Sequence, residues 1–599
     1  MKMMNKTNDQ TIYHVAVPSP LRRLFDYLSP KQLQNVSCNE MLQPGIRVFV
    51  PFGKRELVGI IVGNSKKSSI AISRLKPIKS IIDTKPLIPK HLFDLYIWAA
   101  RYYHNPIGDS LFQSIPSLLR KGKGLPSLET QCWMLTKKGV ELSLSDLSRS
   151  PRKKEFISWL KEKKAITKEE VKQKKISSSI LKKLAEKKLI FLESLPENSY
   201  NFKNKNPLAE KPQNLYPEQQ KALKSINISS FNAYLLFGET GSGKTEVYLQ
   251  AIEKIVCSGK QALVLIPEIS LTPQTLRRFE NRFNTPIVAL HSRLTDKERA
   301  FAWNMARMGK ASIVIGTRSA IFTPLKSPGL IIIDEEHDSS YKQQEGYRYS
   351  ARDLGVIRAQ KESIPIILGS ATPSMESLNN CIENRYTKLT LSCRPEKSFR
   401  PNWLPINIRK SQLINGFSQE LIESIKKVLF EGNQVLIFLN RRGFSPTLSC
   451  YDCGWISNCP NCEARLTVHR KPSRLLCHHC EYTIQVPSTC PSCNSSQLEF
   501  IGQGTERIED TLNVLFPKTP ILRVDRDTTR NKTAMEDLLS VVHSGDSCIL
   551  IGTQMLAKGH HFPDVTLVAI LDADGGLFSP DFRAPERMGQ LITQVAGRS

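Results

Sequence analysis

Runs of apolar residues alternate with amphipathic helical segments through the middle of the chain. An apolar run followed by a helix, repeated several times, is the pattern of a parallel sheet with crossover helices. The strands expected on this pattern are residues 233–238, 262–267, 312–317, 330–335 and 364–370. We therefore predict one α/β lobe over residues 215–395.

The same pattern starts again nearer the C-terminus and is interrupted by a cysteine-rich segment. Its apolar runs are residues 434–440, 521–525, 548–553 and 565–572. We predict a second, similar parallel-sheet lobe over residues 396–599, with an insertion at 446–498. The fold class expected is thus α/β.

Residues 1–110 have a different pattern, that of a small β-rich module. Residues 45–53 and 57–63 are strand-like, with Gly53 and Lys54 at the turn between them, and a helix is expected at 91–104.

Residues 111–200 contain short lysine-rich helical segments followed by a strand-like run. This helix–helix–helix–strand order is typical of a winged helix, and a charged helical linker is the alternative. Residues 201–214 are polar and contain proline, so we expect a linker there.

Charge and hydropathy limit the kinds of partner that the protein can have and its association with membranes. Lysine and arginine number 84 against 56 acidic residues, a net charge of +28. Such an excess favours a polyanionic partner, although solvated lysine-rich surfaces are the alternative. No apolar run is long enough to cross a membrane, and the N-terminus lacks the apolar core of a signal peptide. We therefore predict a cytoplasmic protein with no membrane partner.

A glycine-rich loop follows the first predicted strand of the first lobe and precedes a helix. Its spacing, Gly-x4-Gly-Lys-Thr, is that of a P-loop, whose backbone N–H groups face phosphate oxygens. Lys244 is expected to reach the β and γ phosphates, and the Thr245 hydroxyl to bind Mg²⁺. The residues predicted to bind ATP are Gly238, Glu239, Thr240, Gly241, Ser242, Gly243, Lys244 and Thr245.

An acidic motif, DEEH, ends the strand at 330–335. Asp334 is expected to hold Mg²⁺ and Glu335 to orient or deprotonate the attacking water. We expect His337 to link the ATP site to the other lobe, and Gln219 to read the adenine edge. Together with the P-loop, this motif predicts ATP hydrolysis coupled to motion along a nucleic acid.

Other loops follow predicted strands, at the edge of a parallel sheet where ligands bind. They contain Thr317 and Arg318 and, at 369–374, the segment GSATPS. Beyond DEEH, tyrosines alternate with cations, as in surfaces that stack on unpaired bases, although local packing is the alternative. The nucleic-acid contacts predicted here are Arg318, Tyr341, Tyr347 and Arg348.

Eight of the fourteen cysteines fall between residues 450 and 493 as four CxxC pairs. Each pair supplies two thiolates, and tetrahedral zinc needs two pairs, so two closed structural zinc sites are predicted. The predicted ligands are Cys450, Cys453, Cys459, Cys462, Cys477, Cys480, Cys490 and Cys493. Spacing leaves the pairing open. A nested arrangement is sterically natural, and the alternative ligands are His469, His478 and His479.

The chain ends in QLITQVAGRS. Gln594, Gly597 and Arg598 are expected to face the nucleotide from the second lobe, where an arginine stabilises charge during phosphoryl transfer.

The order of these motifs, with the cysteine segment placed between FLNRRGF (438–444) and GTQM (552–555), resembles the PriA family of superfamily 2 DEEH helicases. The resemblance implies two RecA-like lobes, 3′ to 5′ unwinding of DNA, recognition of abandoned replication forks and primosome assembly. The implied partners are forked and single-stranded DNA, single-strand binding protein, primosome proteins and a replicative helicase loader. It also implies a cytoplasmic, nucleoid-associated location.

The same resemblance assigns residues outside the motor. It implies a pocket for the 3′ end of a nascent strand, lined by Phe25, Asp26, Gly53 and Lys76. It also implies nested zinc pairing and a role for the insertion in strand separation and partner docking.

One departure from the family stands out: its members continue beyond QVAGR, whereas this sequence stops at Ser599. We therefore expect poor ATP hydrolysis by this chain alone. Two other functions are weighed: a related nucleic-acid translocase or RNA helicase, and a truncated, non-catalytic fork-binding scaffold.

Overall fold

The computed structural model describes most of the chain. The described residues are 11–30, 42–143, 150–163, 165–167, 170–171, 174, 176–196, 208–210, 212–239, 241–268, 270–392, 401–408, 412–439, 447–462, 465–470, 473–477, 480–501, 505–524, 541–542, 544–552, 562, 564–571, 573 and 581–597.

An antiparallel sheet forms the N-terminal module. Within residues 12–81 the described strands pair in the order β2-β1-β4-β3-β5. The strands are β1 Ile12–Ala16, β2 Phe25–Leu28, β3 Arg47–Phe52, β4 Arg55–Ser65 and β5 Ser80–Ile81. The predicted turn is confirmed, since Gly53 joins β3 to β4 with a φ of 60°.

Three helices join this module to the first lobe. They are α1 Lys90–Tyr102, α2 Ile107–Gln113 and α3 Ser117–Arg120. Their apolar faces belong to the same core as one face of the lobe 1 sheet. For example, the Tyr96 hydroxyl of α1 donates a hydrogen bond to the Phe322 carbonyl of lobe 1. Helices α2 and α3 therefore go with the N-terminal module, although the sequence placed residues 111–200 in a separate domain.

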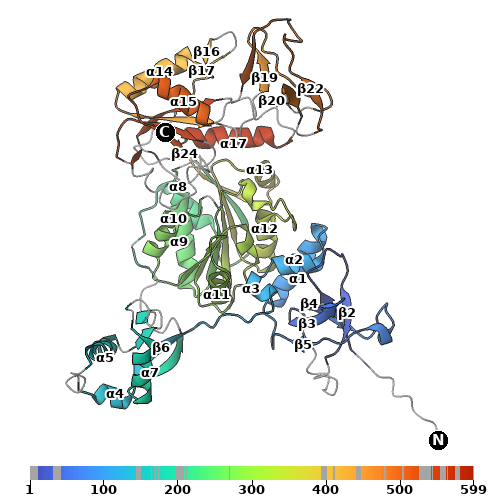
Figure 1. Ribbon diagram of the computed structural model, residues 1–599, viewed down its shortest axis with the longest axis vertical. Coiled ribbons are helices and arrows are strands. Elements are labelled where there is room, and N and C mark those ends of the chain that lie inside the picture. The colour runs from blue at the N-terminus through green and yellow to red at the C-terminus, as the bar shows by residue number, and fades with distance from the viewer. Residues whose placement is uncertain are drawn as a thin grey trace.

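The lysine-rich segment forms a small unit of its own, which projects from the rest of the molecule (Figure 1). In the part of 129–196 that is described, three strands pair in the order β7-β6-β8. The elements are β6 Glu129–Leu135, α4 Lys137–Glu141, α5 Pro151–Lys163, β7 Ala165–Thr167, α7 Ser178–Glu186 and β8 Ile190–Pro196. Apolar residues of α5 and α7 form a core against this sheet, as in a winged helix.

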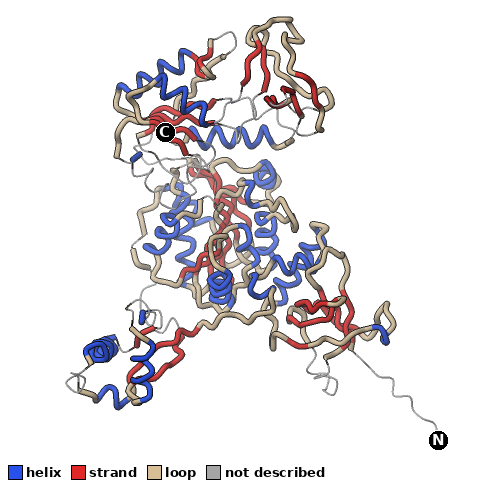
Figure 2. Tube along the Cα trace, in the orientation of Figure 1, coloured by secondary structure: helices blue, strands red, loops and turns tan. Residues whose placement is uncertain are grey.

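Lobe 1 is a parallel sheet between two layers of helices (Figure 2). Over residues 233–391 the described strands run in the order β11-β12-β10-β13-β14-β9-β15. The strands are β9 Ala233–Gly238, β10 Gln261–Leu265, β11 Ile287–Leu290, β12 Ile313–Gly316, β13 Pro328–Asp334, β14 Ile366–Ser370 and β15 Thr387–Leu391. The helices are α8 Pro217–Ser225, α9 Lys244–Cys257, α10 Pro273–Arg282, α11 Asp296–Arg307, α12 Ala351–Lys361 and α13 Met375–Ile382.

Successive side chains of each strand alternate between two cores, because a strand points them to opposite faces of the sheet. Thus Ile331 and Ile333 lie in the core shared with the N-terminal module, and Ile332 lies in the other. All five predicted strands are confirmed. The two that were missed, β11 and β15, lie at the edges of the sheet, where side chains are only partly buried.

Lobe 2 repeats this architecture on a smaller scale. Its described strands pair in parallel in the order β24-β25-β18-β26. They are β18 Gln434–Leu439, β24 Ile521–Val524, β25 Ile549–Gly552 and β26 Val565–Leu571. Helices α14 Gln419–Phe430 and α15 Thr505–Leu515 cover one face, and α17 Ala584–Ala596 covers the other. A short hairpin of β16 Leu413–Ile414 and β17 Phe417–Ser418 precedes α14.

The cysteine-rich insertion forms two small sheets beside lobe 2 (Figure 1). Its outer strands are β19 Thr447–Cys450 and β23 Leu498–Ile501, and its inner strands are β20 Thr467–Arg470, β21 Ser473–Leu476 and β22 Thr483–Gln485. The predicted α/β fold with two parallel-sheet lobes and an insertion is therefore confirmed. Across the described helices, none is both long and apolar enough to span a bilayer.

Candidate nucleotide site and metal centres

The P-loop lies between the end of β9 and the start of α9, as its sequence predicts. Gly241 and Gly243 have φ angles of 85° and 77°, in the left-handed region that glycine adopts without a Cβ penalty. A Cβ on Gly238 would lie 2.5 Å from the Ser242 hydroxyl oxygen, so this position also needs glycine. The loop therefore leads directly into a helix N-terminus, which attracts phosphate. Thr240 lies outside the described residues.

Lys244 is the first residue of α9, and its ammonium group closes the loop on itself. Nζ donates to the Gly238 carbonyl at 2.7 Å and to the Glu239 carbonyl at 3.2 Å. Thr245 follows as the second residue of the helix. Because backbone carbonyls satisfy the ammonium here, phosphate oxygens would replace them when a nucleotide binds.

Gln219 is buried against the back of the P-loop. Its Oε1 accepts from the Tyr216 backbone N–H at 3.0 Å, which caps α8, and its Nε2 donates to the Ser242 carbonyl at 3.0 Å. A Cβ on Gly243 would lie 2.2 Å from that Nε2. The structure thus gives Gln219 a role in shaping the loop, and its contact with adenine stays a prediction.

Asp334 ends β13 and faces the P-loop. Burial, reinforced by the neighbouring Glu335 charge, raises the pKa of Asp334 to about 6, and the Lys244 ammonium opposes this rise. A half-buried carboxylate beside a second carboxylate is stabilised by a nearby cation. Asp334 and Thr245 are the residues that would hold Mg²⁺, a hard cation that prefers oxygen ligands.

Glu335 has a strained backbone, with a φ of 48°. Such a conformation in a residue with a Cβ is uncommon and concentrates at functional sites. Its Oε2 is buried without a hydrogen-bond partner and lies 3.6 Å from His337 Nδ1. An under-satisfied carboxylate oxygen next to the P-loop is suited to accept a proton from water.

His337 lies where the two lobes meet. Its Nδ1 is 2.7 Å from the Ser370 hydroxyl, and its Nε2 is 2.7 Å from Gln594 Nε2. Gln594 belongs to α17 of lobe 2 and also reaches the Thr372 hydroxyl at 3.4 Å. With the amide nitrogen donating, Nε2 of the imidazole accepts and Nδ1 carries the proton toward Ser370. His337 is therefore placed between the lobes, as the sequence suggested, and its coupling role stays a prediction.

Further contacts continue along α17, which lies over α13 of lobe 1 (Figure 1). Glu586 accepts from the Met375 backbone N–H at 2.9 Å, and Gln590 donates to the Pro373 carbonyl at 3.5 Å. These positions and Gln594 are spaced by four, so they share one helix face. Arg583, just before the helix, pairs with Glu376. Gly597 follows the helix as its C-cap, and Arg598 lies outside the described residues.

The sequence reasoning missed Glu336, the last acid of DEEH. This side chain is 1% exposed and accepts from the Ser374 backbone N–H at 2.7 Å and the Ser377 hydroxyl at 2.9 Å. Arg352 lies 3.3 Å from the same carboxylate. Glu336 thus ties the acidic motif to the GSATPS loop. Two adjacent glutamates after a strand gave no indication of which one turns inward.

The tyrosines predicted to stack on bases are buried instead. Tyr341 is 2% exposed, and its hydroxyl donates to the backbone carbonyls of Asp334 and Leu265. Tyr347 is 0% exposed and packs among aromatic rings that include Phe322. These rings are not available to a base, so the structure favours the alternative of local packing.

Two predicted cations lie in the same region. The Arg318 guanidinium donates to the backbone carbonyls of Ser340 and Lys342, at 2.8 and 3.2 Å, and holds this loop in place. Arg348 is exposed, and its carbonyl accepts from the Lys342 ammonium at 2.5 Å.

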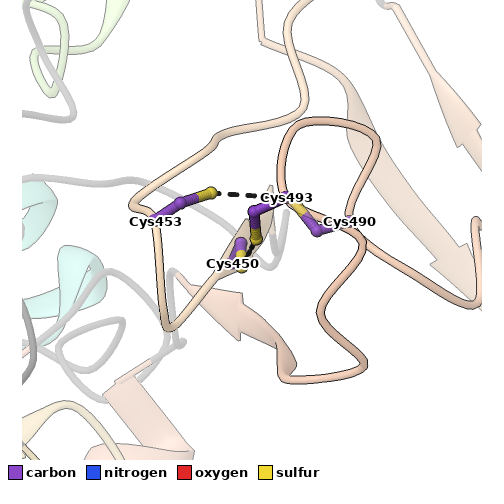
Figure 3. A group of neighbouring side chains, drawn as sticks. All are labelled: Cys450, Cys453, Cys490 and Cys493. Carbon is purple, nitrogen blue, oxygen red and sulfur yellow. Dashed lines mark hydrogen bonds between the residues drawn. The ribbon is translucent and has the colours of Figure 1, made fainter.

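In the insertion, eight cysteines form two clusters with nested pairing. The outer cluster is Cys450, Cys453, Cys490 and Cys493 (Figure 3), and the inner is Cys459, Cys462, Cys477 and Cys480. Sulfur–sulfur distances are 3.6 and 3.6 Å in the outer cluster and 3.4, 3.5 and 3.9 Å in the inner. A tetrahedral site with Zn–S bonds of about 2.3 Å puts its sulfurs about 3.8 Å apart, so both clusters fit zinc.

The predicted nested pairing is thus confirmed by geometry. The alternative ligands His478 and His479 lie outside the described residues, and no side chain is described for His469.

The N-terminal residues predicted to bind a 3′ end lie along β2 and the turn beside it. Phe25 meets Phe52 edge to face at 5.1 Å, next to the turn at Gly53. Asp26 accepts from the Ser68 hydroxyl at 2.5 Å and lies 2.7 Å from His14 Nδ1.

Lys76 follows on the same side of the module. Its carbonyl accepts from the Leu28 backbone N–H at 3.0 Å, and its side chain is exposed. The structure therefore brings the chain segments of the predicted pocket together. DNA contact by their side chains stays a prediction.

Comparison with known proteins matches three segments to family models. Residues 14–116 match a 3′ DNA-binding domain (3′BD), residues 216–381 the DEAD/DEAH box helicase, and residues 459–484 the PriA DNA helicase Cys-rich region (CRR) domain.

Curated relatives match nearly the whole chain. The replication restart protein PriA of Haemophilus influenzae is 46% identical over 595 residues, covering 98% of this chain and 80% of the relative. The same protein of Bacillus subtilis is 35% identical over 649 residues, covering 96% and 80%. That of Chlamydia trachomatis is 38% identical over 603 residues, covering 98% and 79%.

Proposed function

The chain belongs to the PriA family of replication restart proteins, and on that premise we propose that it is an ATP-driven helicase that unwinds DNA 3′ to 5′ at stalled or abandoned forks. A DNA helicase role in replication restart comes with the family. What we propose in addition is that ATP supplies the energy, that unwinding runs 3′ to 5′, and that the substrate is a stalled or abandoned fork.

One observation carries the use of ATP: a contact between lobes is built into the nucleotide site. His337 of the acidic motif bonds to Gln594 of lobe 2 at 2.7 Å, a few residues from Asp334 and Glu335. A change at the γ-phosphate would alter the acidic motif and, through this contact, the relative position of the lobes. Two lobes that change their spacing with the nucleotide state are the requirement for a translocating motor.

Each residue of the site then has a chemical role. The P-loop N–H groups and the Lys244 ammonium would hold the phosphates, and Asp334 with Thr245 would hold the cation. When bound, Mg²⁺ neutralises charge on the β and γ phosphates. Glu335, with its free carboxylate oxygen, orients and deprotonates the attacking water. An arginine from the second lobe, Arg598 in this sequence, would stabilise the transition-state charge.

The remaining modules supply recognition of the fork. We assign the segment around Phe25, Asp26, Gly53 and Lys76 to a free 3′ end, where the Asp26 carboxylate would accept a hydrogen bond from the terminal hydroxyl. The insertion would carry two zinc ions and act in strand separation. The net charge of +28 favours all of these DNA contacts.

The protein partners proposed are single-strand binding protein, primosome proteins and a replicative helicase loader. The location proposed is the cytoplasm, at the nucleoid. These assignments follow from the family and are tested by copurification from cells with stalled forks.

Unwinding of a labelled fork by wild type and by Lys244→Ala tests the proposal. We expect the substitution to reduce unwinding by about 100-fold or more while fork binding persists, because the phosphates lose their ammonium partner. Lys221→Ala on α8 is the matched control, because this exposed lysine lies outside the P-loop. Equal activity of Lys244→Ala and wild type would favour the non-catalytic scaffold, and a preference for RNA duplexes would favour an RNA helicase.

A further inference from the structure

A tyrosine on the P-loop helix contacts the carboxylate expected to hold Mg²⁺. Tyr248 lies one turn after Lys244 on α9 and is 2% exposed. Its hydroxyl donates a hydrogen bond to Asp334 Oδ1 at 3.1 Å. The phosphate-binding helix and the acidic strand are therefore joined by a direct side-chain bond.

A third segment shapes the same position. Gly369, near the end of β14, packs against the tyrosine so closely that a Cβ there would lie 1.5 Å from the Tyr248 hydroxyl oxygen. The Gly369 carbonyl also accepts from the Glu336 backbone N–H at 3.0 Å. The hydroxyl thus sits between the ends of β13 and β14, in a space that exists because residue 369 has no side chain.

The phenol acts as the donor in this contact, because an ionised carboxylate offers only acceptor oxygens. A second tyrosine, Tyr341, donates to the backbone carbonyl of Asp334 at 2.7 Å. The backbone of Asp334 is thus fixed by one tyrosine and its side chain by another.

We infer that Tyr248 is a positioning residue for the magnesium site: its hydroxyl holds the Asp334 carboxylate in the orientation that binds Mg²⁺ with the nucleotide. This inference rests on the proposed function and deepens it. Groups that orient a metal ligand contribute strongly to metal affinity, and removing one costs about 10- to 100-fold.

The test is Tyr248→Phe, which removes one oxygen atom and keeps the ring in its cavity. The Mg²⁺ concentration for half-maximal binding of a fluorescent ATP analogue is measured in wild type and variant, and ATP turnover is followed over the same Mg²⁺ range. We expect the half-saturating Mg²⁺ concentration to rise about tenfold, with nucleotide affinity at saturating Mg²⁺ within about twofold of wild type.

Tyr234→Phe is the matched control. Tyr234 is equally buried in the same lobe, and its hydroxyl accepts from the Asn227 backbone N–H at 2.9 Å, away from Asp334. Thermal unfolding of both variants checks that each one folds.

Three outcomes would each overturn either the inference about Tyr248 or the proposed function, and they can be told apart. An unchanged Mg²⁺ requirement in Tyr248→Phe overturns the inference. An equal shift in Tyr234→Phe also overturns it, because the effect is then a general loosening of the lobe. Failure of wild type to bind the nucleotide analogue at any Mg²⁺ concentration overturns the proposed function itself.

Discussion

Opposite charges face each other in the nucleotide site, the Lys244 ammonium on the P-loop and the Asp334 carboxylate at the end of β13. The lysine lowers the pKa of Asp334, but burial and the Glu335 charge outweigh it and leave that pKa at about 6. Proton binding by Asp334 therefore competes with cation binding near neutral pH.

The raised pKa of Asp334 predicts two pH dependences of opposite sign, one for folding stability and one for Mg²⁺ affinity. The ordinary carboxyl pKa is 3.8, so between about pH 4 and about pH 6 Asp334 binds more of a proton in the folded chain than in the unfolded one. The contribution of Asp334 to the stability of the metal-free protein therefore falls as pH rises through this window. Because Mg²⁺ needs the ionised carboxylate, its affinity should fall as pH is lowered through about 6, by up to about tenfold per pH unit.

The measurement is Mg²⁺-dependent binding of a fluorescent ATP analogue between about pH 5 and about pH 8. Asp334→Asn, which cannot titrate, should flatten the profile. A wild-type profile that is already flat across pH 6 would contradict the account.

Sequence patterns predicted those site residues that act together within one short segment of the chain. The P-loop glycines and Lys244 are readable because their spacing alone creates the phosphate cradle. Glu336 and Tyr248 were not, because their partners, Ser374 and Gly369, come from other segments and meet them only in the folded sheet. Aromatic residues among cations likewise gave no sign that Tyr347 is buried.

At the scale of elements, one face of α17 forms the described contact with lobe 1. Its contact positions, Glu586, Gln590 and Gln594, repeat every four residues. A single helix therefore makes these contacts with lobe 1, and its contact with His337 lies within the acidic motif.

We predict that Gln594→Ala uncouples the lobes. DNA-stimulated ATP turnover should fall by about tenfold, since His337 and Thr372 lose their partner from lobe 2, while nucleotide affinity stays within about twofold because the P-loop belongs to lobe 1. Thr593→Ala, an exposed neighbour on the same helix, is the control. A parallel loss of nucleotide affinity in Gln594→Ala would show that the residue acts in binding rather than in coupling.

The zinc insertion yields a second prediction at this scale. Elemental analysis should find about two zinc ions per chain in wild type and about one in Cys453→Ser, because the outer cluster loses a ligand. Cys257→Ser changes an exposed cysteine outside the insertion and should keep both ions. One zinc ion or none in wild type would refute the nested two-site arrangement.

Most elements were predictable because buried strands carry an unbroken apolar run. The five central strands of lobe 1 were found in this way, whereas β11 and β15 were missed because edge strands bury less of their surface. Helix periodicity predicted α1 but carried no information about what its apolar face packs against. The core that α1, α2 and α3 share with lobe 1 therefore became visible only in the structure.

At the scale of the whole molecule, lobe 1 lies at the centre and the other modules extend from it (Figure 1). The N-terminal module shares a hydrophobic core with lobe 1, and lobe 2 meets it through α17. The N-terminal module and lobe 1 therefore form a single packed body. This continuity could not be read from the sequence, because it joins residues far apart in the chain, such as Tyr96 and Phe322, which are 226 positions apart.

The measurement that tests this account most directly is ATP turnover with and without a forked DNA that carries a free 3′ end. The account predicts turnover that rises on addition of the fork and that is lost in Lys244→Ala. The ratio between the two conditions, rather than the absolute rate, is the criterion. Tight binding of the fork with no ATP binding and no turnover would contradict the account, because the P-loop, the acidic motif and the contact with α17 would then serve no motor.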